Sequence, residues 1–320
     1  MLYGFVKIIA RVALRFYCRE LHLNNRNVLN QQGPLMLAAN HPNSFLDAIL
    51  LCTIFDKPVY SLARGDAFKG KLVTKLLSSF KMLPVYRVSE GVENLEENYK
   101  TFDECKAIFK RGGIVLIFSE GGCINEWHLR ALKKGTARLA LSSWEDGIPL
   151  KVLPVGINYS SFGKFGKNIH LLFGEFIESN AINLNDGTAR AIHSFNANLR
   201  QRLSTCVVEI DKRDKAKIRS TFYFPQSLFK RSLLFLPAVA GWVLHIPLYY
   251  PLKKFITRHT NSTDHFDSIV IALLFVVYPF YVCITTLLAY LVTAQWYAIL
   301  LLLIFPATGW AYLQLKKQLD

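Results

Sequence analysis

The stretch LMLAANHPNSFLD, residues 35–47, decides the fold of this chain. Its first five residues, 35–39, form a short uninterrupted apolar run, which is typical of a strand that is buried on both faces. A polar loop follows, and a helical pattern that begins at Asn43 or Ser44 predicts a helix over 44–55. A buried strand, a polar loop and a helix in this order indicate an α/β layer, whose sites follow the carboxyl ends of strands.

The same alternation continues downstream of this stretch. Further strands are predicted at 58–63, 114–118 and 152–157, and further helices at 72–80, 92–109 and 129–144. The predicted fold class is therefore α/β with a mostly parallel central sheet, followed by a C-terminal α-helical membrane region.

The membrane region follows from composition. The 320 residues carry a net charge of +15, yet 52% of them are hydrophobic and only 19% are charged. No charged residue occurs in the 48 residues of 268–315, which predicts a transmembrane hairpin with its turn at 293–295. The segment 232–252 is also uncharged but contains three prolines, so we favour a re-entrant or interfacial segment over a spanning one.

The chain begins with a basic amphipathic pattern. Residues 1–24 are predicted to form a membrane-surface helix, because cationic residues recur every four positions among apolar ones: Lys7, Arg11, Arg15 and Arg19. An ordinary surface helix packed on the domain is the alternative. The predicted organisation is this helix, a catalytic domain over 25–220 and a membrane region over 221–320, with the basic run 212–219 at the boundary.

The polar loop after the first strand contains the candidate catalytic pair, His41 and Asp47. Two residues six positions apart do not share a face of a regular helix, so we expect His41 to lie in the loop and turn back to Asp47. The carboxylate then fixes the tautomer of the imidazole and leaves its other nitrogen free as a general base.

Three more blocks follow in order along the chain. The first ends in Arg87, the second contains Glu120, Gly121 and Gly122 and continues to Lys133, and the third contains Pro154-Val155. Each block alone is commonplace, since a Gly-Gly pair is usually a turn and an isolated arginine is usually solvated.

Together with the His-Asp loop, these blocks resemble the phospholipid/glycerol acyltransferase family over roughly residues 35–160. The resemblance implies a glycerol-phosphate acyltransferase-like domain in which His41 is the general base and Asp47 is its partner. It also implies that an acceptor phosphate site is shaped by Arg87, Glu120, Gly121 and Gly122, and that Pro154 and Val155 help to form the acyl-donor pocket.

Two features depart from the usual pattern of the family. Five residues instead of four separate His41 from Asp47, and Cys123 stands where most members have a phosphate-binding arginine. Both features resemble the fungal-type glycerol-3-phosphate acyltransferase branch. We expect Lys133 to supply the missing charge, with Arg130 and Lys134 as competitors.

The predicted function is membrane-bound acyl transfer from acyl-CoA or acyl-carrier protein to glycerol 3-phosphate or 1-acylglycerol 3-phosphate in phospholipid biosynthesis. We expect no metal or organic cofactor, no nucleic acid partner, contact with membrane lipids, and a catalytic domain on the cytoplasmic face. One alternative is O-acylation of a phosphate-free lysolipid such as an amino-acid-derived lipid. Another is a non-catalytic lipid-binding membrane protein. The oligomeric state is not predicted.

Overall fold

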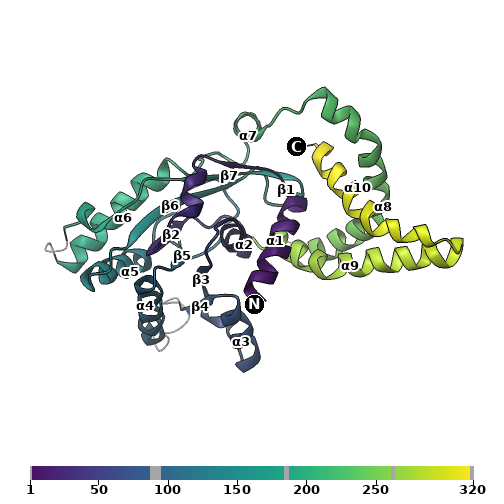
Figure 1. Cartoon of the computed structure of the whole chain (residues 1–320). Coiled ribbons are helices and arrows are strands. Elements are labelled where there is room, and N and C mark those ends of the chain that lie inside the picture. Colours follow the sequence, from purple (N-terminus) through teal and green to yellow (C-terminus); the bar gives the residue numbers. More distant parts are fainter. Residues whose placement is uncertain (1, 87–94, 184–186, 261–263, 318–320) are drawn as a thin grey trace. The chain divides into compact units, whose positions relative to one another are not determined.

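The computed structural model describes residues 2–86, 95–183, 187–260 and 264–317 (Figure 1). Arg87, one of the predicted phosphate-binding residues, lies outside the described residues. The chain divides into two compact units. The first comprises Met1–Arg11, His22–Asn158 and His170–Lys212, and the second comprises Val12–Leu21, Tyr159–Ile169 and Arg213–Asp320. The last segment of the second unit therefore begins within the basic run predicted as a boundary.

A seven-stranded sheet has the strand order β1-β7-β6-β2-β5-β3-β4. Its strands are β1 (Cys18–Leu23), β2 (Leu35–Ala39), β3 (Val59–Arg64), β4 (Met82–Val85), β5 (Ile114–Phe118), β6 (Lys151–Tyr159) and β7 (Lys167–Phe173). The five strands from β6 to β4 are parallel. The predicted α/β fold with a mostly parallel sheet is confirmed.

Strand β2 lies at the centre of the sheet between β5 and β6, and all five of its residues are buried. In this register the last residue of β2, Ala39, is level with Phe118 of β5 and Val155 of β6. The loops that leave β2 and β5 therefore start side by side, and they are the loops that contain His41 and Glu120.

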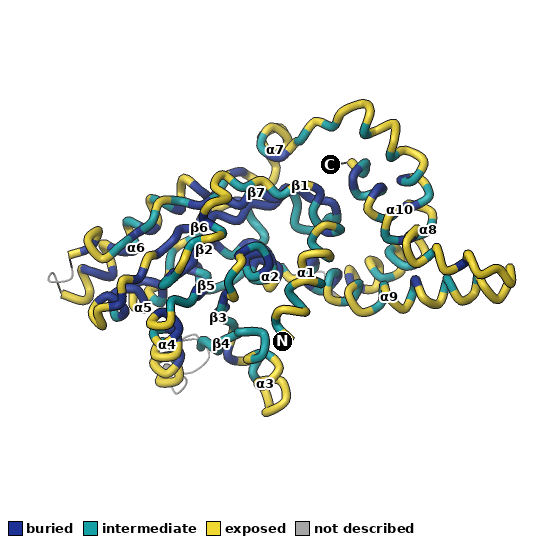
Figure 2. The backbone as a smooth tube through the Cα atoms, viewed as in Figure 1, coloured by how far each residue is buried: buried dark blue, intermediate teal, exposed yellow. Residues whose placement is uncertain are grey.

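The helices of the first unit are α1 (Leu2–Tyr17, which ends in the second unit), α2 (Phe45–Ile54), α3 (Lys71–Ser79), α4 (Leu95–Lys110), α5 (Lys134–Glu145) and α6 (Thr188–Ser204). Apolar side chains of α4, α5 and α6 pack with those of β2, β5 and β6 into one buried core. Figure 2 shows the burial of these strands, whereas α4 is exposed on its outer side.

The N-terminal helix is shorter than predicted. It ends at Tyr17, and Arg19 lies in β1 instead of continuing the basic stripe, because residues 18–23 join the edge of the sheet. Within α1, Lys7 donates to the carbonyl of Phe55 and Arg11 donates to that of Thr53, so two of its cations cap the end of α2. Its apolar residues Phe5, Ile8 and Val12 are exposed, and binding to a membrane surface stays a prediction.

The predicted helix over 129–144 begins only at Lys134. Residues 129–133 form an irregular segment, because backbone N–H groups at three of these positions donate to Glu209, Glu120 and the Ser119 carbonyl instead of to a helix. Strands β1 and β7 are not predicted by the sequence pattern.

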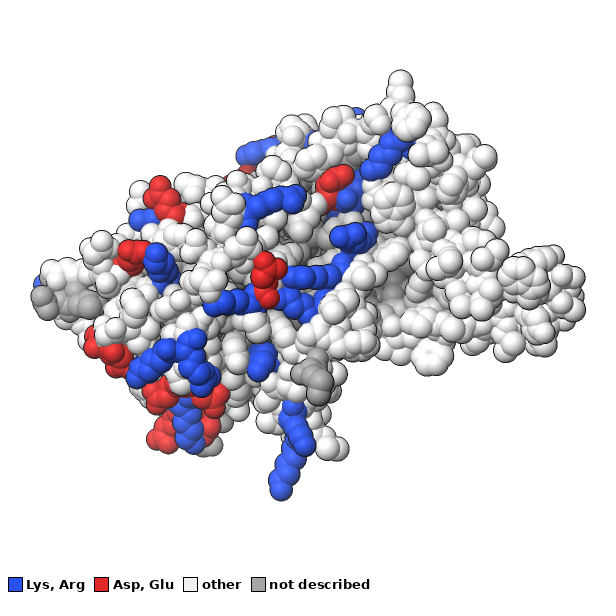
Figure 3. All heavy atoms as spheres, viewed as in Figure 1, with Lys and Arg blue, Asp and Glu red and all other residues white. Residues whose placement is uncertain are grey.

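The second unit contains α7 (Lys215–Phe222), α8 (Leu228–Thr260), α9 (Phe266–Thr293) and α10 (Leu301–Leu315). Three segments of it are long and apolar enough to cross a membrane: Leu228–His259, Phe266–Thr293 and Trp296–Leu315. On the face shown in Figure 3 these helices present a surface almost without charged side chains. The hairpin turns where predicted, at Ala294, which ends α9 with a φ of 53°.

Helix α8 is continuous but curved, and it contains Pro237, Pro247 and Pro251 (Figure 1). At its start Lys230 donates to the Gln314 side chain at 2.8 Å. In its middle a Cβ on Gly241 would clash with the Thr308 carbonyl oxygen. Near its other end, Tyr249 packs on the ring of Phe165, whose carbonyl accepts from Lys316. Both ends of α8 therefore lie near the same end of α10, which supports the re-entrant interpretation; whether α8 crosses a membrane stays a prediction.

Candidate active site

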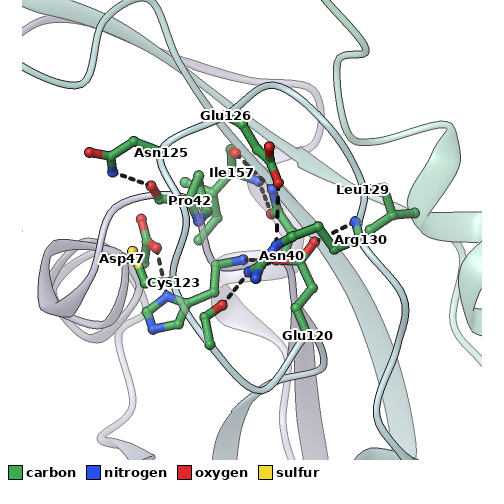
Figure 4. Close-up of polar contacts among 12 residues, drawn as sticks. Asn40, Pro42, Asp47, Glu120, Cys123, Asn125, Glu126, Leu129, Arg130 and Ile157 are labelled. Atoms are coloured by element: carbon green, nitrogen blue, oxygen red, sulfur yellow. Dashed lines mark hydrogen bonds and ion pairs between the residues drawn. The ribbon is translucent and has the colours of Figure 1, made fainter. Parts of the chain in front are cut away.

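Asp47 lies at the start of α2, next to His41 (Figure 4). Helix α2 begins after Ser44, which adopts a φ of 52°, and this places Asp47 in the first turn. One carboxylate oxygen of Asp47, Oδ2, accepts from His41 Nδ1 at 2.8 Å and from the amide of Asn43 at 2.8 Å. Because the carboxylate accepts, Nδ1 carries the proton, and Nε2 keeps its lone pair as a base.

Packing fixes the imidazole as well as the hydrogen bond does. The ring of Phe118, at the end of β5, stacks on that of His41 with centroids 3.8 Å apart and planes 10° apart. Asp47 is completely buried, whereas the His41 side chain keeps 16% of its surface exposed. The base is therefore held rigidly and remains accessible to a substrate.

The loop that carries His41 is anchored on both sides. Before it, the side chain of Asn40 donates to the Ile157 carbonyl at 3.1 Å and accepts from the Ile157 amide at 2.7 Å, as a strand residue would. After it, Asn125 donates to the Pro42 carbonyl at 2.7 Å. These contacts tie the loop to β6 and to the segment that follows β5.

Cys123 stands at the position of the missing arginine, and its sulfur accepts from the Ser44 amide at 2.9 Å. Cys123 thus contacts the N-terminal end of α2, next to the catalytic pair. The sequence assigns it no role beyond the absence of an arginine.

Glu120 is almost fully buried and links the base to the glycine block. Its carboxylate accepts from the His41 amide at 2.8 Å, from the Arg130 amide at 2.9 Å and from Arg130 Nη2 at 2.8 Å. The same guanidinium also donates to the Gly122 carbonyl. Glu120 therefore positions the backbone of His41, and Arg130 is its counter-ion.

Lys133 lies beside the glycine block, as predicted from its place in the sequence. Gly121 has a φ of 68°, and a Cβ built on it would lie 2.8 Å from Cγ of Lys133, so the lysine stem crosses directly over this glycine. The Lys133 amide donates to the Ser119 carbonyl at 2.7 Å, and Lys133 is the N-cap residue of α5. A cation and the positive end of a helix thus lie together at this edge of the sheet.

Two residues far along the chain hold the segment that contains Arg130. Arg200 of α6 donates to the Arg130 carbonyl at 3.0 Å, and Glu209 accepts from the Leu129 amide at 2.9 Å. Neither residue is predicted from the sequence, because each is an ordinary surface charge there and only the fold brings it to this segment.

The predicted acyl-donor residues lie in the sheet itself. Pro154 and Val155 are buried in β6, where the Val155 carbonyl accepts from the Asn40 amide at 3.4 Å and the Pro154 carbonyl accepts from the Gly174 amide at 2.9 Å. They support the His41 loop from behind, and a role in the donor pocket stays a prediction. Among the described residues no group of three or more His, Cys, Asp or Glu could hold a metal ion.

Comparison with known proteins gives one family and one solved structure. Residues 20–158 match the family described as Acyltransferase. No curated protein matches. The crystal structure of the 1-acyl-sn-glycerophosphate (LPA) acyltransferase PlsC from Thermotoga maritima is similar, with 15% sequence identity, a TM-score of 0.46, and coverage of 66% of this chain and 81% of that one.

The matched residues contain both the His-Asp loop and the glycine block, so the family resemblance predicted from the sequence is confirmed over the part of the chain that carries the site. The chain belongs to the acyltransferase family.

Proposed function

We propose that this protein transfers a fatty acyl group from an acyl thioester to a hydroxyl of glycerol 3-phosphate or 1-acylglycerol 3-phosphate in membrane phospholipid biosynthesis. The observation that carries the proposal is the pair of His41 Nδ1 and Asp47 Oδ2, 2.8 Å apart, in a loop that Glu120 links to the segment before Lys133. A histidine held in one tautomer beside a cationic site suits a hydroxyl acceptor that carries a phosphate.

The reaction we propose has one acyl transfer and no acyl-enzyme. Nε2 of His41 takes the proton of the acceptor hydroxyl while its oxygen attacks the thioester carbonyl carbon. The tetrahedral intermediate then collapses, the carbon–sulfur bond breaks, and the thiolate leaves with the proton from the imidazolium. Asp47 stabilises the imidazolium between these steps. The chain has no Gly-x-Ser-x-Gly sequence, so a serine nucleophile elbow is not available.

Oxyanion stabilisation requires donors that point at the thioester oxygen. The amides of His41, Asn43 and Ser44 already donate to Glu120, Asp47 and Cys123 respectively. These three amides of the loop are therefore poor candidates for this role, and the role falls to other donors of the site.

The acceptor phosphate, in this proposal, binds at Lys133 and the N-terminal end of α5. Lys133 is exposed, whereas Arg130 directs its guanidinium at Glu120 and the Gly122 carbonyl. A phosphate needs charge-assisted donors that are not already committed. Lys133 is thus preferred over Arg130 as the phosphate ligand, and Arg130 is preferred as a positioning residue.

One observation favours a second candidate, a lysolipid acceptor without phosphate. Cys123 replaces the usual arginine, and the guanidinium of Arg130 does not take its place, since it is bound to Glu120. The remaining candidate site has fewer cations than a strong phosphate clamp would provide.

Acyl transfer by the purified protein in detergent tests the proposal. With acyl-CoA as donor, glycerol 3-phosphate, 1-acylglycerol 3-phosphate and a phosphate-free lysolipid are compared as acceptors. We expect transfer to a phosphate-bearing acceptor, with Lys133→Gln raising its KM at least tenfold. Transfer to the phosphate-free acceptor alone, with no effect of Lys133→Gln, would replace the first candidate by the second.

A further inference from the structure

Three segments of the second unit meet at Phe165. Its carbonyl accepts from Lys316 Nζ at 3.3 Å, just after α10 ends. Its ring lies edge-on to that of Tyr249, with centroids 5.8 Å apart and planes at 75°. Tyr249 precedes Lys253 by one turn of α8, so these contacts bring Lys253 and Lys316 to the same place.

Burial and charge show that this place is rich in cations. The pKa of Lys316 is lowered to about 8, first by burial and then by the positive charges of Lys253, Lys164 and Arg19. Among the described salt bridges none joins Lys253 or Lys316 to an acidic side chain. Repulsion of this kind costs stability unless an anion is bound between the cations.

The nearest acid in the second unit is already committed. Asp267, at the start of α9, is completely buried; it forms an ion pair with Lys167 and accepts from the Tyr17 hydroxyl at 2.9 Å. This carboxylate therefore neutralises Lys167 and does not serve Lys253 or Lys316.

Arg19 gives a second, independent sign of a missing anion. It is 7% exposed, and its Nη2 donates to the carbonyls of Leu313 and Lys316. Its Nη1 is buried and has no hydrogen-bond partner among the described residues. A buried guanidinium nitrogen without an acceptor is expensive, and an oxygen of a bound anion at the end of α10 would satisfy it.

The surroundings select a lipid as the anion. Lys253 and Lys316 follow directly on long apolar segments, and the exposed aromatic residues Tyr250 and Phe255 flank Lys253 on α8. Lysines and aromatic residues at the ends of apolar helices lie at the depth of lipid headgroups. An anion bound there would have its acyl chains along the apolar surface of the helices.

We propose that Lys253 and Lys316, backed by Arg19, form a binding site for the phosphate of an anionic phospholipid, separate from the catalytic loop. The site binds this lipid as a structural ligand of the membrane unit. It is independent of the identity of the acyl acceptor.

Native mass spectrometry of the full chain in maltoside detergent tests this site. The probes are phosphatidylglycerol, which is neither acceptor nor product of the proposed reaction, and phosphatidylcholine with the same acyl chains. We expect one tightly bound phosphatidylglycerol, and we expect Lys253→Gln with Lys316→Gln to lower its apparent affinity at least tenfold. The matched control, Lys254→Gln with Lys110→Gln, removes two exposed lysines elsewhere and should keep the affinity.

Two more measurements distinguish lipid binding at this site from binding at the catalytic loop and from a general attraction of anions. His41→Ala should bind phosphatidylglycerol like the wild type, because the site is not the catalytic one. Phosphatidylglycerol should raise the unfolding temperature of the control but not that of the Lys253/Lys316 variant. Equal affinity for phosphatidylcholine, equal stabilisation by inorganic phosphate, or an equal loss in the control variant would each overturn the proposal.

Discussion

Glu120 is the residue whose role depends most on the structure. As part of a Gly-Gly block it is expected to shape a phosphate site, but a carboxylate repels a phosphate and its oxygens are taken by the His41 amide and by Arg130. It acts on the chemistry through the groups that it positions. Sequence alone does not distinguish the two roles, because the donors to Glu120 come from 79 residues before it and 10 residues after it.

Glu120→Gln should lower kcat by about 10- to 100-fold, because a neutral amide weakens the pair with Arg130 and loosens the His41 loop. Initial rates at saturating donor and acceptor measure this. The control is Glu126→Gln, since Glu126 lies 3.6 Å from the same guanidinium but is 29% exposed. Equal rates for the two variants would contradict a positioning role for Glu120.

His170 makes stability depend on pH in the mildly acidic range. Burial, and then the nearby His22, lower the pKa of His170 to about 4, whereas an unfolded histidine titrates near its ordinary value of 6.5. The unfolded state therefore binds more protons between these values, and stability falls as the pH is lowered from about 6.5 towards 4.

We expect this effect to reach the order of 1 kcal/mol at pH 5, after solvent screening of a partly exposed ring. His170→Gln should then lose less of its unfolding temperature than the wild type when the pH changes from 7 to 5, as measured by thermal unfolding in detergent. Parallel losses in the two proteins would show that another group is responsible.

At the scale of elements, the glycine block and the start of α5 act as one unit. Gly121→Ala combines a φ of 68°, which an alanine adopts only with strain, with a Cβ that meets the Lys133 stem. We expect Lys133 to be displaced and the KM for the phosphate-bearing acceptor to rise more than tenfold, in steady-state assays with acceptor varied.

The matched control for this change is Gly135→Ala, in the first turn of α5. A Cβ on Gly135 has open space, and alanine stabilises a helix relative to glycine by up to about 1 kcal/mol. Its KM should remain at the wild-type value. An unchanged KM in Gly121→Ala would contradict the placement of the phosphate at Lys133.

The sequence predicts most strongly the elements that apolar runs alone specify. The predicted bounds of β2 and β5 match the structure, and α2 begins within a residue of its prediction, because buried parallel strands and a polar loop leave a clear pattern. Residues 129–133 fit a helical pattern, but contacts with Glu120 and Glu209 override it. The roles of the Asn40 side chain and the stacked Phe118 escape prediction, since both depend on a neighbouring strand.

At the scale of the whole molecule, the membrane unit raises the question of which segments cross the bilayer. The hairpin of α9 and α10 and its turn follow from the absence of charge, whereas three prolines leave α8 ambiguous. The structure gives the shape of α8, which starts at Gln314 and ends near Lys316, but no sequence pattern specifies where a proline-containing helix bends.

Single-cysteine labelling in sealed vesicles tests this topology. Ser227→Cys and Lys254→Cys, in a chain whose six cysteines are replaced, should react with an impermeant maleimide from the same side, and Gln295→Cys should react from the other side. Protease cleavage within 212–219 should occur on the side of Ser227, which we propose is the cytoplasmic one. Labelling of Ser227→Cys and Lys254→Cys from opposite sides would mean that α8 spans the membrane.

The central claim is that His41, held by Asp47, is the base of an acyl transfer to a phosphate-bearing hydroxyl. Thiol release from acyl-CoA, dependent on added glycerol 3-phosphate or 1-acylglycerol 3-phosphate, tests it most directly with wild type, His41→Ala and Asp47→Asn. The account predicts that His41→Ala keeps the wild-type unfolding temperature within a few degrees and loses acceptor-dependent release, and that Asp47→Asn lowers kcat by about 10²- to 10⁴-fold. Acceptor-dependent release at the wild-type rate by folded His41→Ala would contradict it.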